Sequence, residues 1–116
     1  MERIVVEKDC LWFDDVKVEP PFDRDKIDAI LGEPRVDEWE YRNVKGEAVR
    51  IVTCLWDSLG IRADVDKADS EVYKSFTVYV ADGERFAHSA AGTFSGRVMI
   101  GEKDYANAKW NMTICG

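Results

Sequence analysis

Hydrophobic and polar positions alternate most clearly between Ala48 and Val65. From Ala48 to Trp56 both sets of alternating positions are mostly apolar, which is typical of a strand covered on both faces inside a sheet. From Ile61 to Asp66 apolar residues alternate with charged ones, which predicts a strand with one buried and one solvated face. The intervening residues predict a short turn, in which Gly60 takes a positive φ.

The first third of the chain predicts a strand pair and one helix. Strands are expected over 2–8 and 10–18 and end at residues 20–21, because these two prolines cannot donate ladder hydrogen bonds. Asp23 fits the N-cap of a helix that ends at Gly32 and Pro34. The buried face of this helix is expected to carry Ile27, Ile30 and Leu31, and its solvated face Arg24, Asp25 and Asp28.

Strand-like patterns dominate the rest of the chain. Seven strands are expected over 36–43, 48–56, 61–66, 72–81, 85–89, 96–101 and 109–114, and turn-like residues, among them 103–104, separate them. We therefore predict a single α+β domain over residues 1–116, a twisted antiparallel sheet with one short helix packed on it.

The uneven distribution of charge along the chain indicates a basic binding partner. The chain has 116 residues, 46% of them hydrophobic, and a net charge of −7. Residues 1–40 hold thirteen of the 23 acidic side chains and six of the 16 basic ones, so the remainder holds ten of each and is neutral. An acidic surface repels phosphate backbones, which argues against direct nucleic-acid binding, and it attracts a basic protein.

The cellular compartment is predicted from what the sequence lacks. No apolar run approaches the ~20 residues of a membrane span, and the charged start of the chain does not resemble a signal peptide. Three widely spaced cysteines without a C-x-x-C pair fit free thiols in a reducing compartment. We expect a cytoplasmic protein that does not contact membranes.

Two sets of candidate binding residues follow. Acidic runs are usually solvated, but the concentration of the net charge here favours a partner surface made of Asp14, Asp15, Asp25, Asp28, Glu33, Asp37, Glu38 and Glu40. A small-molecule cleft would use Trp39, Tyr41, Trp56 and Asp57, with an indole stacking on the ligand and the carboxylate accepting hydrogen bonds. The competing interpretation is that Trp56 closes the core and Asp57 bonds turn amides.

Catalytic and metal chemistry find little support. His88 is the only histidine, and pairing with Cys54 or a serine would be needed for nucleophilic catalysis, yet no nucleophile elbow accompanies it. Asp64, Asp66 and Asp69 resemble the start of a calcium loop, but Ala68 occupies the next ligand position. We expect no catalytic residues, no metal site and no cofactor.

Three motifs carry a family resemblance. They are the helix stop Leu31-Gly32-Glu33-Pro34, the turn Leu55-Trp56-Asp57-Ser58-Leu59-Gly60-Ile61 and the late segment 94–101, F-S-G-R-V-M-I-G. In this order they make the chain resemble a bacterial family of small uncharacterised α+β domains, for which no catalytic residues are recognised. The resemblance implies a bacterial cytoplasmic accessory protein, of a kind suspected beside polymorphic toxin or secretion genes.

Three functions remain open on the sequence alone. The first is an immunity protein that neutralises a basic toxin, such as a nuclease, by electrostatic association. The second is a small-molecule-binding or structural accessory domain. The third is an enzyme that uses His88.

Overall fold

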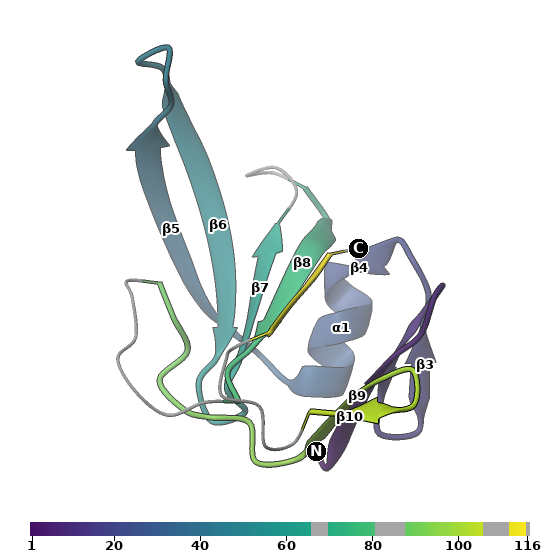
Figure 1. Ribbon diagram of the computed structural model, residues 1–116. Helices are drawn as coiled ribbons and strands as arrows, with labels where there is room; N and C mark the ends of the chain where they lie inside the picture. Colours follow the sequence, from purple (N-terminus) through teal and green to yellow (C-terminus); the bar gives the residue numbers. More distant parts are fainter. Residues whose placement is uncertain (66–69, 81–87, 106–111, 116) are drawn as a thin grey trace.

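The computed structural model describes residues 1–65, 70–80, 88–105 and 112–115, which form two β-sheets and one helix (Figure 1). The first sheet has the strand order β10 (Lys103–Asp104), β9 (Arg97–Ile100), β1 (Arg3–Val6), β2 (Leu11–Phe13) and β3 (Val16–Val18). The second has the order β11 (Met112–Cys115), β8 (Val72–Val78), β7 (Ile61–Val65), β6 (Ala48–Trp56) and β5 (Arg35–Arg42), and β4 (Phe22–Asp23) pairs with β8. We call them the small sheet and the large sheet.

The predicted α+β fold with one antiparallel sheet is therefore wrong, since the fold is mostly β and has two sheets. The opening strands do not join the large sheet. Instead β1 lies between β2 and β9, antiparallel to β2 and parallel to β9. Strand patterns in the sequence are local, and they do not reveal that residues 3–6 pair with residues 97–100.

Helix α1 (Arg24–Leu31) begins and ends near the predicted residues. Ile27 and Leu31 are buried and Gly32 ends the helix, as expected, while Ile30 is only partly buried. The φ of Gly32 is +97°. The prediction that Arg24 and Asp28 face water is wrong, because both contact other parts of the chain. The Arg24 guanidinium donates to the Ser70 carbonyl, and Asp28 accepts a 2.7 Å hydrogen bond from the Tyr73 hydroxyl. The two residues, four positions apart, share a helix face, and the buried tyrosine requires a polar partner there.

One hydrophobic core joins the two sheets and the helix. Phe76 of β8 is 1% exposed, and its ring lies 6.0 Å from the ring of Phe13 in the small sheet and 5.5 Å from that of Phe22 in β4. Both contacts are edge-to-face. The helix lies between the large and small sheets in Figure 1, so its apolar stripe completes the same core.

Several predicted strands shift when their partners are known. Residues 8–9 and 14–15 both lie between strands, so the opening region is a three-stranded meander. Residues 103–104, predicted as a turn, form β10, because Gly101 reverses the chain earlier with φ +60°. Of the strand expected over 85–89, residues 85–87 lie outside the described residues, and residues 88–89 are not in a strand.

Candidate functional site

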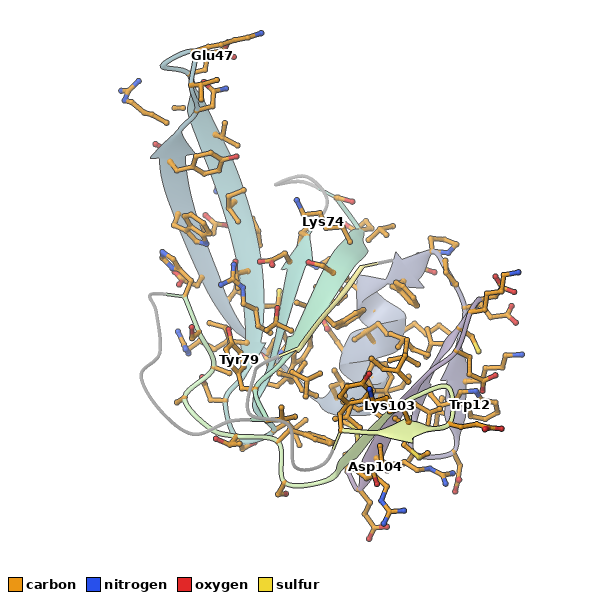
Figure 2. All side chains as sticks on the ribbon, in the orientation of Figure 1. Trp12, Glu47, Lys74, Tyr79, Lys103 and Asp104 are labelled. Carbon is orange, nitrogen blue, oxygen red and sulfur yellow. The ribbon has the colours of Figure 1, made fainter. Side chains whose placement is uncertain are left out.

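The most exposed regular structure is the hairpin of β5 and β6. β5 pairs with β6 along its whole length, from Arg35 opposite Leu55 to Arg42 opposite Ala48. β7 pairs only with residues 53–56 of β6. Residues 38–52 therefore extend past β7 as a two-stranded hairpin, which is plain in Figure 1, with Glu47 at its far end in Figure 2, and Val36 and Asp37 lie at its base. We call residues 36–52 the arm.

Burial follows this geometry. Residues 52–56 of β6 are buried on both faces, whereas residues 48–51 are not, so the predicted interior strand is interior for only half its length. Of the five large hydrophobic side chains exposed in the described part of the chain, three lie on the arm: Val36, Tyr41 and Val44. Exposed apolar groups gathered on one projecting element are typical of an interaction surface.

The two faces of the arm differ in chemistry. Alternate residues of a strand share a face, so Trp39 and Tyr41 lie together, and their ring centroids are 6.1 Å apart. The opposite face carries Glu38 and Glu40, and Arg50 forms an ion pair with Glu38 and lies opposite Glu40 in the strand register. Arg42 lies on the same face and donates to the Gly46 carbonyl at 2.8 Å. The arm thus has an aromatic face and a charged face, on which the carboxylates of Glu38 and Glu40 are neighbours.

His88 packs against the base of the aromatic face. Its imidazole stacks on the Trp39 indole at 4.2 Å with an interplanar angle of 5°, and its Nδ1 lies 2.5 Å from Asp37 Oδ2. Its backbone has φ +64°, a conformation that residues with a Cβ rarely adopt. We call Asp37, Trp39 and His88 the clasp, because their contacts hold residue 88 against β5.

A partly buried polar network lies beneath the clasp. The Trp39 Nε1–H donates to Thr53 Oγ1 at 3.1 Å, and the Thr53 hydroxyl donates to Asp64 at 2.9 Å. Arg62 binds the same Asp64 carboxylate and donates to the carbonyl of His88 at 3.0 Å. The network therefore connects three strands of the large sheet to the clasp and fixes the base of the arm.

The hydroxyls of the network and the Cys54 thiol make contacts other than with His88. An aspartate beside a histidine can orient an imidazole for proton transfer. The hydroxyls of Thr53 and Ser75, however, both bind Asp64. Cys54, the conceivable nucleophile, neighbours Thr53 along β6 and so lies on the other face of the sheet, where the Arg24 guanidinium is 3.8 Å from its sulfur. The sheet thus separates Cys54 from His88.

The four residues of the predicted cleft are not brought together. Trp39 and Tyr41 lie on the arm, whereas Trp56 is 4% exposed in the core and donates to the Gly32 carbonyl at 2.7 Å. Asp57 follows β6 and accepts two hydrogen bonds from Arg35, at 2.8 and 3.0 Å, and one from the Ala91 N–H. The hydrogen bonds from Arg35 hold the pKa of Asp57 below its ordinary value, and the Ala91 amide acts in the same direction.

The eight predicted partner-binding carboxylates do not form one surface. Asp14 and Asp15 lie in the β2–β3 turn of the small sheet, where the backbone N–H groups of Glu2 and Arg3 lower the pKa of Asp14. Asp25 and Asp28 belong to α1, and Glu33 follows it. The other three lie on β5 and form part of the arm: Asp37, Glu38 and Glu40.

Sequence reasoning missed the clasp. The spacing of Asp37, Trp39 and Tyr41 already places these residues on one strand face, and that signal was available. His88 lies 51 positions from Asp37, and no local pattern connects them. Within the described residues no group of three or more potential metal ligands occurs, and no helix has the length and apolar character needed to cross a bilayer.

Comparison with known proteins places the chain in a family without assigning an activity. No curated protein and no solved structure matches the chain. Residues 3–114 match the model of a domain of unknown function, DUF7738. The resemblance to an uncharacterised family is thus confirmed at this level, while a bacterial origin stays a prediction. Because the match extends over nearly the whole sequence, this chain belongs to the DUF7738 family.

Proposed function

We propose that this chain is a non-enzymatic protein-binding module, a cytoplasmic inhibitor of the immunity-protein kind that neutralises a basic toxin such as a nuclease. The arm is the surface that binds. The observation that carries the proposal is the arm itself, which combines exposed apolar side chains with the neighbouring carboxylates of Glu38 and Glu40. Among the described strands, none pairs with residues 38–52 from outside the hairpin.

Energetic considerations support binding over a purely structural role. A two-stranded hairpin is marginally stable in water, and burial of a face normally stabilises it. Here the clasp and the ion pair between Arg50 and Glu38 stabilise the base, and the outer part remains exposed. A preformed projecting element of this kind binds with little loss of conformational freedom.

Charge supports a basic partner. Asp37, Glu38 and Glu40 lie within four consecutive positions of β5, and the acidic residues of α1 and Glu33 precede them along the chain. Carboxylates at the rim of an interface raise the rate of association with a basic protein and have less effect on dissociation. A nuclease that grips phosphate presents such a basic surface.

The alternatives have less support. A small-molecule site would need the predicted cleft, whose residues lie in separate places, and an enzyme that uses His88 in a nucleophilic pair would need a nucleophile beside it. Small-molecule binding and catalysis therefore rank below protein binding.

The test uses the product of the adjacent reading frame. That product is expressed alone and together with this chain, and we expect growth arrest by the product alone and relief by co-expression. Replacing exposed Val36 by serine should weaken the purified complex, while the same change at Val16, which is similarly exposed on the small sheet at 46% against 52%, should not. A neighbouring product that neither arrests growth nor binds, or equal effects of V36S and V16S, would overturn the proposal.

A further inference from the structure

The open edge of β5 has a defined hydrogen-bonding pattern. At the end of the arm the Asn43 N–H donates to the Glu47 carbonyl at 3.0 Å, so this closing pair is hydrogen-bonded. Hydrogen-bonded and non-hydrogen-bonded pairs alternate along an antiparallel ladder. The pairs of Arg42, Glu40 and Glu38 with β6 are consequently of the second kind, and the backbone N–H and C=O groups of these residues point away from β6.

Those outward groups lie where β5 has no described neighbour. β5 pairs with β6 alone among the described strands and forms one edge of the large sheet. Unpaired N–H and C=O groups on a long edge strand are a template for another strand. Residues 38–42 lie further out on the arm than Asp37, where the clasp holds the chain.

The side chains along this edge select the kind of strand that fits. Glu38 and Glu40 are neighbouring carboxylates next to the open backbone groups, and Arg50 forms an ion pair with Glu38. Arg42 lies on the same face but donates to the Gly46 carbonyl at the tip, so the acidic part of this face is at residues 38–40. Trp39 and Tyr41 present aromatic surface on the other face. A surface hollow lined by Glu38, Trp39, Glu40 and Arg50 lies against the same stretch.

We propose that β5 binds a basic β-strand of the partner, which pairs with residues 38–42 and extends the large sheet by one strand. In this arrangement lysine or arginine side chains of the added strand lie beside Glu38 and Glu40, and the apolar residues between them lie beside Trp39 and Tyr41. This inference deepens the proposed function and rests on it for the identity of the partner. Acidic residues on the edge also discourage pairing with a second copy of this chain.

The experiment is an amide hydrogen-exchange measurement by NMR with a synthetic probe. The probe is an eight-residue peptide of alternating lysine and valine with blocked ends, and the control is the corresponding peptide of alternating glutamate and valine. On binding of the basic peptide, exchange at the Glu38, Glu40 and Arg42 amides should slow at least tenfold. The Trp39 and Tyr41 amides, which already bond to β6, should change little.

Charge variants provide the second readout. Glu40→Lys should weaken binding of the basic peptide about tenfold, because it replaces an attractive cross-strand pair by a repulsive one. Glu47→Lys makes the same change of charge at the tip of the arm, beyond the paired stretch, and should alter the affinity less than twofold (Figure 2).

The outcomes separate this inference from the proposed function. Strand addition would be overturned if both peptides bound equally or if exchange at the three outward amides were unchanged. It would also be overturned if these amides were protected without peptide when the concentration of this chain is raised, because two copies would then pair with each other. If the neighbouring product binds through V36S-sensitive contacts while these amides exchange as before, only strand addition fails. If the peptide pairs as described and the neighbouring product does not bind, only the proposed function fails.

Discussion

Gly60 should tolerate no side chain, and a single methyl group tests this. It is the last residue of the turn between β6 and β7 and has φ +69°, and a Cβ there would lie 2.4 Å from the backbone nitrogen of Phe94 and 2.6 Å from the carbonyl carbon of Thr93. The left-handed conformation costs a residue with a Cβ about 1–2 kcal/mol, and forcing packed backbone apart typically costs about 1–3 more. Gly60→Ala should therefore lower the free energy of unfolding by about 2–5 kcal/mol.

Gly46 is the matched control for this substitution. It has a similar φ of +79° in the turn of the arm, but nothing lies within 4 Å of the position of a Cβ. Gly46→Ala should thus lose only the conformational part, about 1–2 kcal/mol. Urea unfolding followed by tryptophan fluorescence measures both variants, and equal losses for G60A and G46A would refute the argument that Gly60 is required by contact with the 93–94 backbone.

Three further predictions concern the backbone strain at His88, the Asp57 carboxylate and the cysteines. His88→Gly should be about 1 kcal/mol more stable than His88→Ala, because both lose the clasp and only glycine relieves φ +64°; equal urea midpoints would contradict this strain. The pKa of Asp57 is lower in the folded than in the unfolded chain because Arg35 binds it, so its contribution is present above the unfolded pKa and is lost as the pH falls through the folded value. Urea midpoints between pH 5 and 2 should consequently fall less steeply for Asp57→Asn than for the parent, and parallel profiles would speak against this linkage. Buried Cys54 should react with a thiol reagent only at the rate of unfolding, whereas partly exposed Cys10 reacts in the native state. Mass spectrometry of the labelled peptides measures both rates, and fast labelling of both cysteines would be inconsistent with the burial of Cys54.

Elements with a strong local pattern were predictable from the sequence. In β7 the alternation of apolar and charged residues correctly predicted which side chains are buried. Gly60 was correctly predicted to take a positive φ, because few other residues adopt that conformation, and Gly32 was correctly predicted to end the helix. The ends of β6 were correctly predicted, but the burial of its outer half was not. Residues 48–51 are exposed or only partly buried because β7 is too short to pair with them, and the pattern within β6 does not reveal the length of β7.

The two-sheet arrangement and the clasp required long-range information. Val5 pairs with Met99, and Asp37 contacts His88, so both features depend on residues that are distant in the chain. The role of Asp28 was mispredicted for a similar reason, because its position on the helix looks solvated until the Tyr73 hydroxyl is brought to it. Charge counting located an acidic first third, but only the fold separates the carboxylates of the arm from those that stabilise the turn at Asp14.

The parallel pairing of β1 with β9 has a consequence for the order of folding. Arg3 and Ile4 lie beside Arg97 and Val98, so closing this ladder requires almost the whole chain, while the β5–β6 hairpin needs only neighbouring residues. Contacts between distant positions form late because the entropy of loop closure must be lost first. During synthesis the small sheet therefore stays incomplete until residue 100 has left the ribosome. Over that interval the edge of β1 that later pairs with β9 is open to strands of other chains.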